Sequence, residues 1–310
     1  MALLTVSCVV LYAGFVEYFW GWSTVFSTWE AVGLGPVLLA LLLFVSTYFV
    51  RGYRLYSYFP RETSGRFIEL FHLAQLHNLL NIMLPFRSGE TSFPLLMRSE
   101  FGVPLLKGTS ALLVMRLLDL HALLAAAGVG LVLRGGHSTG GEWLLWLAFL
   151  VAPLLCFQIK GPLFSFAGRR LAGKPLKIVE ELEAGLPAGQ GDFIRAWAVT
   201  FLNWGVKVVV FAWGLAVMGI VPLSACFGGA LGGELSSVLP FHAPGGVGTY
   251  PAGIVAGAVA LGAPVDKAAM DLLGKAAVSM HLLIIVSAFL GAGMSLVLAA
   301  IKRRLAKDTV

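Results

Sequence analysis

LPFRSGE, residues 84–90, is the stretch that decides how this chain folds, because it places a proline, an arginine and a glutamate inside a strongly apolar region. A second stretch, LPFHAPGGVG at residues 239–248, begins with the same three residues. Proline removes a backbone donor and interrupts a helix. Charged side chains are almost never fully buried unless they are paired. Both stretches therefore predict a break between two helices, with polar groups gathered at the break.

Composition identifies the surroundings of these breaks as a membrane. The 310 residues are 58% hydrophobic and 12% charged, and the mean hydropathy is +0.86, which exceeds what a soluble domain carries. Apolar runs of about 20 residues suit helices and are too long for strands of a membrane barrel. We expect an all-α polytopic membrane protein with about six transmembrane helices, at residues 2–19, 31–50, 110–133, 143–159, 208–233 and 276–301.

The net charge of +6 is explained by membrane topology. Lys and Arg gather in cytoplasmic loops of membrane proteins. Here they gather in three clusters that follow predicted spans: Arg51, Arg54, Arg61 and Arg66; Arg169, Arg170, Lys174 and Lys177; Lys302, Arg303, Arg304 and Lys307. These clusters predict a multi-pass protein of the cell inner (plasma) membrane with both termini in the cytoplasm. They leave no reason to expect a nucleic-acid partner.

The sequence shows no pattern of a catalytic, metal or cofactor site. Cys8, Cys156 and Cys226 all fall in apolar segments, where a lone cysteine behaves as a small hydrophobic residue. We find no paired metal ligands and no nucleophile beside a base. We therefore expect a protein that is not an enzyme and that uses no cofactor and no metal.

The two LPF stretches belong to a longer internal repeat. SFP at residues 92–94 corresponds to TYP at 249–251, FGVPLLK at 101–107 to LGAPVDK at 261–267, and His121 to His281. The order is preserved, which predicts two repeats, at about residues 31–135 and 190–301, in one membrane domain of residues 1–310. Each repeat would hold a re-entrant helical hairpin, at residues 67–101 and 223–261. A single span between the repeats would invert the second, as in transporters.

The tips of the two hairpins carry the candidate substrate site. Ser92 and Thr249 each precede a proline by two residues, as helix N-caps do, and a helix N-terminus favours an anion. Arg87 adds a full positive charge, with Glu90 nearby. Three glycines after the second break suit either a phosphate cradle or a tight turn: Gly245, Gly246 and Gly248.

Other polar residues complete the candidate set. Arg116 and Asp119 are three residues apart and share a helix face, either as a structural ion pair or as substrate contacts. His242 lies within the second break. Charge balance or ion coupling is assigned to three further candidates: Glu234, Lys207 and Lys275. Lys207 and Lys275 also suit an interfacial position in which the charge reaches water.

Three motifs resemble one known family. LPFRSGE, MRLLDL at residues 115–120 and HAPGGVG at residues 242–248 are similar to motifs of the transmembrane, flippase-like domain of the lysylphosphatidylglycerol synthase family, including its standalone members. The resemblance covers about residues 36–298. It implies movement of lipids between leaflets. Because the sequence ends shortly after the last predicted span, we expect any aminoacyl-transferase to be a separate lipid-modifying enzyme.

The sequence leaves three functions open. The first is a flippase that moves an anionic phospholipid or a polyprenyl-phosphate-type lipid between leaflets by alternating access. The second is a secondary transporter of a small soluble anion, and the third is a membrane-embedded lipid-phosphate enzyme with His242 or Glu90 as acid or base. A stripe of small residues would favour lipid if it lined a lateral gap, but it equally suits close helix packing: Gly228, Gly229, Gly232 and Gly233.

Overall fold

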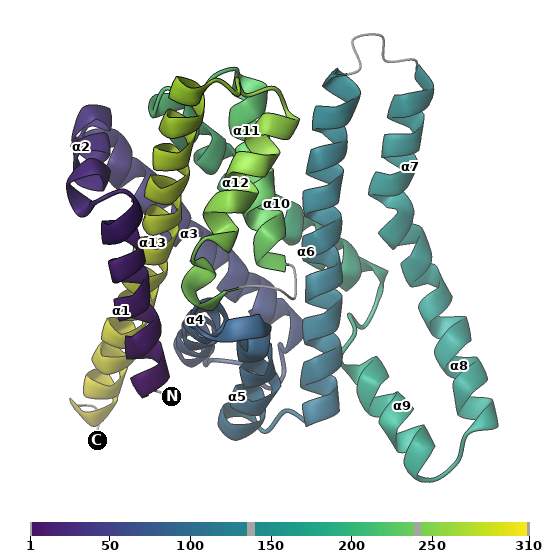
Figure 1. The fold of residues 1–310 in the computed structure, drawn as a ribbon. Helices are drawn as coiled ribbons and strands as arrows, with labels where there is room; N and C mark the ends of the chain where they lie inside the picture. The colour runs from purple at the N-terminus through teal and green to yellow at the C-terminus, as the bar shows by residue number, and fades with distance from the viewer. Residues whose placement is uncertain (1, 135–139, 239–242, 309–310) are drawn as a thin grey trace. The chain divides into compact units, whose positions relative to one another are not determined.

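The computed structural model describes residues 2–134, 140–238 and 243–308, and these residues form helices and their connections (Figure 1). In chain order the elements are α1 (Ala2–Phe19), α2 (Trp22–Val32), α3 (Leu34–Tyr58), α4 (Phe67–Met83), η1 (Pro85–Thr91), α5 (Ser92–Phe101), α6 (Leu105–Arg134), α7 (Gly140–Cys156), η2 (Phe157–Ile159), α8 (Lys160–Arg170), α9 (Lys174–Ala184), α10 (Gln190–Val217), α11 (Leu223–Val238), η3 (Pro244–Gly246), α12 (Thr249–Ala260) and α13 (Lys267–Asp308).

Five helices in the described chain are long and apolar enough to cross a bilayer. They cover Leu34–Tyr58, Leu105–Gly130, Gly140–Arg170, Gln190–Val217 and Lys267–Leu305. The protein is thus an all-helical, polytopic membrane protein, as the composition predicts. The predicted span at residues 2–19 corresponds to α1, in which a shorter apolar segment, Val10–Phe19, is found.

One predicted span is wrong. Residues 208–233 do not form one helix, because α10 ends at Val217 and α11 begins at Leu223. Gly219 adopts a positive φ of 88° in the connection, and Pro222 immediately precedes α11, where a proline is tolerated at a helix start. The long apolar run therefore contains the end of one helix and the start of another.

Both predicted breaks are present. The helix α4 ends at Met83, η1 occupies the LPFRSGE stretch, and α5 begins at Ser92. In the second copy, α11 ends at Val238 and α12 begins at Thr249. Residues 239–242 of that break lie outside the described residues. The re-entrant entry of these helix pairs into the membrane stays a prediction.

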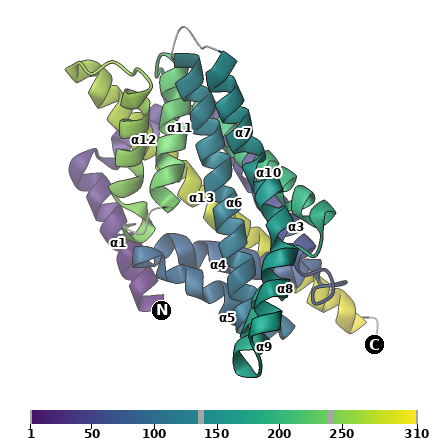
Figure 2. The ribbon, with the colours of Figure 1, turned by 90° about the vertical axis from the view of Figure 1, so that its right-hand side faces the viewer.

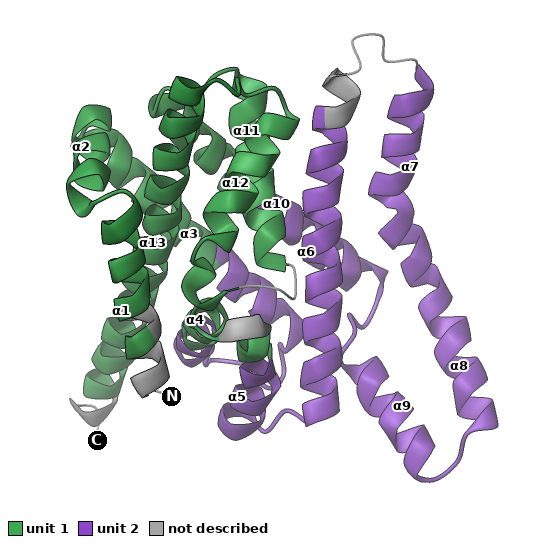
Figure 3. Cartoon of the chain, in the orientation of Figure 1, with its two compact units in different colours: residues 1–49, 75–90, 205–310 green, residues 50–74, 91–204 purple. Residues whose placement is uncertain are grey.

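The chain divides into two compact units, each with its own core (Figure 3). Unit 1 comprises residues 1–49, 75–90 and 205–310, and unit 2 comprises residues 50–74 and 91–204. Tyr12, Val16, Val25, Met83, Val278, Leu282 and Ile285 form a core cluster in unit 1. Leu55, Phe59, Leu70, Leu73, Ala74, Phe93, Met97, Val103, Ala111 and Met115 form one in unit 2. These units are defined by compactness, whereas the predicted repeats concern symmetry, so the repeats stay a prediction.

Glycines hold α11 and α12 against each other within unit 1, where the two helices lie side by side in both views (Figures 1 and 2). A Cβ on Gly228 would lie 2.2 Å from the carbonyl oxygen of Gly257, and a Cβ on Gly232 would lie 2.1 Å from that of Gly253. No side chain fits at such distances. The glycine stripe therefore serves close helix packing, as small residues commonly do in membrane proteins.

We expect Gly232→Ala to destabilise the protein by about 1–3 kcal/mol, because the added methyl forces the two backbones apart. Gly205→Ala is the matched control, since a Cβ there meets nothing within 4 Å and alanine favours a helix over glycine by about 1 kcal/mol. Thermal unfolding of the purified protein in detergent, followed by tryptophan fluorescence, measures both. Equal stability of Gly232→Ala and the unmutated protein would contradict the packing role.

Candidate functional site

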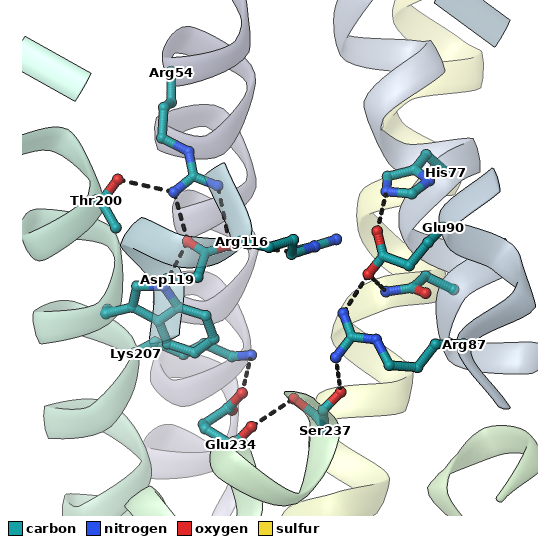
Figure 4. Close-up of polar contacts among 12 residues, drawn as sticks. Arg54, His77, Arg87, Glu90, Arg116, Asp119, Thr200, Lys207, Glu234 and Ser237 are labelled. Carbon is teal, nitrogen blue, oxygen red and sulfur yellow. Dashed lines mark hydrogen bonds and ion pairs between the residues drawn. The ribbon is translucent and has the colours of Figure 1, made fainter. Parts of the chain in front are cut away.

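Arg87 and Glu90 form an ion pair within η1, in unit 1 (Figure 4). The guanidinium of Arg87 donates through Nη2 to Glu90 Oε1 and through Nη1 to the main-chain carbonyl of Ser237. Glu90 Oε1 also accepts from Asn81 Nδ2 at 3.1 Å, and Glu90 Oε2 lies 3.8 Å from His77 Nε2. The Arg87 side chain is 13% exposed and that of Glu90 20%. The two predicted residues are thus joined and largely removed from the surface.

The local backbone explains the residue types of the Arg-Ser-Gly-Glu stretch. Arg87 has a φ of 54°, in the left-handed region that a bulky residue rarely adopts. Such a conformation costs about 1–3 kcal/mol and is retained where the surroundings hold it. A Cβ on Gly89 would lie 2.4 Å from the carbonyl oxygen of Leu80 and 2.5 Å from Asn81 Cα. Glycine therefore lets η1 pass against α4, which brings Glu90 to Asn81 and His77.

A second buried carboxylate lies on α11, also in unit 1. The side chain of Glu234 is 1% exposed and accepts from Lys207 Nζ at 2.8 Å and from Tyr250 Oη at 2.7 Å. Ser237, whose carbonyl binds Arg87, donates its hydroxyl to the main-chain oxygen of Glu234 at 2.7 Å. The predicted residues Lys207 and Glu234 therefore form one ion pair. The last turn of α11 links that pair to Arg87.

Tyr250 is a site residue that sequence reasoning missed. Its position in the TYP segment marks the start of a helix, but its hydroxyl binds Glu234 and its ring stacks on His281, with centroids 4.8 Å apart. A hydrogen bond of 2.7 Å joins His281 Nδ1 to Tyr12 Oη. The buried His281 thus has a packing and hydrogen-bonding role. Because Tyr250 and Glu234 are 16 residues apart, no spacing in the sequence indicates this contact.

Unit 2 holds a separate buried network around Asp119. Arg116 Nη1 donates to Asp119 Oδ2 at 3.1 Å, which confirms the predicted contact. The fuller partner is Arg54, whose Nη1 and Nη2 donate to the two carboxylate oxygens at 2.5 and 3.3 Å. Trp204 Nε1 donates to Oδ1 at 2.8 Å, and Arg54 Nη1 also donates to Thr200 Oγ1 at 2.9 Å. Figure 4 shows these contacts.

The Arg54 side chain is buried rather than part of an exposed basic cluster, and the side of the membrane on which Arg54 lies stays a prediction. The helix α3 continues to Tyr58 and places Arg54 against Asp119, with the arginine side chain only 5% exposed. Within α3, Arg54 lies on the same face as Thr47, which is also buried and precedes it by about two helical turns.

The two predicted helix caps are displaced by one residue. Ser92 and Thr249 are the first residues of α5 and α12, while the N-cap positions are Thr91 and Gly248. Neither N-cap residue makes a side-chain capping hydrogen bond. Each helix therefore begins one residue earlier than the predicted caps imply, and the capping role of Ser92 and Thr249 is wrong.

The glycines of the second break adopt turn conformations. Gly245, Gly246 and Gly248 have φ values of 65°, 71° and 70°, which glycine adopts without strain. The N–H of Gly246 donates to the carbonyl of Ala243 at 2.8 Å. The turn role is thus confirmed, and a phosphate cradle at these glycines stays a prediction.

Two candidates gain no geometric support. Lys275 Nζ lies 2.7 Å from Asp271 Oδ2 in an exposed pair on α13, and such pairs contribute little. His242 lies outside the described residues. Among the residues that the structure does describe, no group of three or more His, Cys, Asp or Glu side chains could hold a metal ion.

We expect Arg54→Gln to destabilise the protein by about 3–5 kcal/mol, because it removes the guanidinium that binds both oxygens of the buried Asp119 carboxylate. Arg116→Gln should cost about 1 kcal/mol, since its side chain is 26% exposed and Asp119 keeps Arg54. Thermal unfolding in detergent separates the two variants. Equal losses would show that Arg116 carries as much of the network as Arg54.

The comparisons with known proteins agree with the sequence motifs. The family model described as Lysylphosphatidylglycerol synthase TM region matches residues 2–287. Searches of curated proteins and of solved structures returned no match. The matched region contains both helix breaks and the Asp119 network, and it extends over nearly the whole chain. The chain belongs to the lysylphosphatidylglycerol synthase TM region family.

Proposed function

We propose that this protein is a transporter that moves an anionic, phosphate-bearing lipid between the leaflets of the cell inner (plasma) membrane. The observation that carries the proposal is Arg87, a largely buried arginine in a left-handed conformation at a helix break. Ionisable residues within membrane-spanning proteins are costly and mark substrate pathways. Membership of a family named for a lipid synthase supports a lipid as the substrate.

The chemistry of the site suits a phosphate group. An arginine guanidinium binds phosphate through two parallel hydrogen bonds. The helix α12 belongs to the same unit as Arg87, and the positive end of its dipole favours an anion. The carboxylate of Glu90 balances the positive charge of Arg87. The proposed substrate set is completed by Ser92, Arg116, Asp119, His242, Gly245, Gly246 and Gly248.

The proposed transport cycle uses the internal repeat. Two inverted repeats, at about residues 31–135 and 190–301, would each contribute a re-entrant hairpin and would rock against each other. The Lys207–Glu234 pair balances charge during this movement. Any modification of the lipid belongs to a separate enzyme, and both termini of the transporter lie in the cytoplasm.

A small soluble anion is the second candidate substrate. The glycines of α11 pack against α12, so they supply no argument for an opening toward the lipid phase. The same arginine and helix start would bind a free phosphate equally well. The test of the proposal therefore has to separate a lipid from a soluble anion.

The first test is native mass spectrometry of the purified protein. We expect the unmutated protein to retain a defined anionic lipid and Arg87→Ala to lose it, by about tenfold or more, since a charge-assisted hydrogen bond contributes about 1.5–3 kcal/mol. Arg66→Ala is the matched control, because Arg66 forms an exposed ion pair with Glu100. Excess inorganic phosphate is added in a second series.

The outcomes separate the substrates. Displacement of a retained lipid by phosphate would show that the lipid head group occupies the Arg87 site. Arg87-dependent binding of phosphate with no retained lipid would favour the soluble anion. Equal nonspecific lipids in all three proteins, together with no phosphate binding, would remove Arg87 from the substrate site.

Inversion of the repeats is tested by cysteine accessibility. In a background with Cys8, Cys156 and Cys226 replaced by Ala, Lys174→Cys and Val265→Cys introduce thiols at exposed positions. We expect a membrane-impermeant maleimide to label Val265→Cys from outside the cell and Lys174→Cys only after the membrane is opened, because inversion puts them on opposite sides. Labelling of both from one side would contradict the inverted repeat.

A further inference from the structure

We infer that the proton is the coupling ion and that Glu90 occupies Arg87 as an internal anion, which the phosphate of the substrate displaces as Glu90 takes up one proton. This inference rests on the proposed function and specifies how its site is regulated.

Both terminal nitrogens of the Arg87 guanidinium already donate hydrogen bonds within the protein. Its Nη2 donates to Glu90 and its Nη1 donates to the carbonyl of Ser237. Recognition of a phosphate through two parallel hydrogen bonds uses the same nitrogens. An anion that binds Arg87 through Nη1 and Nη2 therefore competes with the carboxylate of Glu90, which carries the same sign of charge.

The surroundings of Glu90 favour protonation once Arg87 is lost. Arg87 of η1 and His77 of α4 are charged or titratable side chains that contact Glu90. Asn81 of α4 donates a neutral hydrogen bond, and α11 contributes to the cluster through the uncharged carbonyl of Ser237. A largely buried carboxylate that loses its cationic partner is costly in the ionised form. The O–H bond that forms on Glu90 replaces one that breaks in hydronium or in a buffer acid, and one anion and one proton are bound together.

The same displacement would act on α11. Ser237 lies in the last turn of α11, where main-chain carbonyls carry partial negative charge that attracts a cation. A phosphate on Arg87 neutralises the guanidinium and competes for its Nη1, so the contact between η1 and α11 weakens. Substrate binding, proton uptake and release of α11 would thus occur in one step.

The two other buried carboxylates discussed above, Glu234 and Asp119, have different hydrogen-bond donors. Glu234 keeps Lys207 and Tyr250 as donors, and Asp119 keeps Arg54, Arg116 and Trp204. Asp119 keeps a cationic partner when either arginine is lost, whereas Glu234, like Glu90, keeps a neutral donor when its cation is lost. Of the three, Glu90 is the carboxylate that shares its arginine with the end of a helix.

The test measures binding of short-chain phosphatidylglycerol by isothermal titration calorimetry in detergent. Its phosphodiester does not titrate near neutral pH, unlike a phosphomonoester, whose second pKa is about 6. Where Glu90 is ionised in the free protein and protonated in the complex, affinity should rise about tenfold for each unit by which the pH falls. Titrations in two buffers with different ionisation enthalpies should report one proton taken up per lipid.

Variants locate the proton. Glu90→Gln should bind at about pH 8 as tightly as the unmutated protein binds at low pH, and its affinity should not depend on pH. His77→Gln should keep the pH dependence. Glu62→Gln is the control for loss of an ion pair elsewhere, because Glu62 pairs with Lys107 in unit 2; its binding should match that of the unmutated protein.

Each other outcome overturns one claim. A pH dependence that persists in Glu90→Gln and disappears in His77→Gln assigns the proton to His77 and refutes the inference. Binding that requires Arg87 but is independent of pH refutes proton coupling and leaves the proposed function intact. If Arg87→Ala binds the lipid as tightly as the unmutated protein at every pH, the proposed function itself fails. If Glu90→Gln does not fold, proton uptake by His77→Gln decides: one proton per lipid supports Glu90 as the acceptor, and none refutes the inference.

Discussion

The ion pair between Arg87 and Glu90 is the interaction on which the LPFRSGE break depends. A bilayer offers no water to satisfy charges or unbonded backbone groups. The break places both kinds of group together, and the contacts of Arg87 with Glu90 and with the carbonyl of Ser237 satisfy several of them at once. The strained φ of Arg87 and the glycine at position 89 are the local conditions for this arrangement.

The buried carboxylates of Asp119, Glu234 and Glu90 differ in the groups that donate hydrogen bonds to them. Asp119 accepts hydrogen bonds from two arginines and a tryptophan. Glu234 accepts from a lysine and a tyrosine. Glu90 shares one arginine with a helix end. Removing one partner from a buried pair is strongly destabilising unless others remain. Asp119 therefore keeps an arginine when the other one is lost.

Close helix packing gives these charged groups a firm support. In unit 1, Glu234 and Ser237 lie on α11, which packs through its glycines on α12. A helix held backbone to backbone by small residues has little freedom to shift alone. A displacement of α11 would therefore carry α12 with it.

The sequence alone determined the membrane-protein class, the helix breaks near Pro85 and Pro244, and the pairing of Arg116 with Asp119, because hydropathy, proline geometry and helical spacing act over a few residues. Its motifs also indicated the family. Only the tertiary structure decided that Arg54 is the fuller partner of Asp119, that Tyr250 binds Glu234, and that residues 208–233 contain two helices. Those outcomes depend on which side chains meet across distant segments, and spacing along the chain carries no information about such contacts.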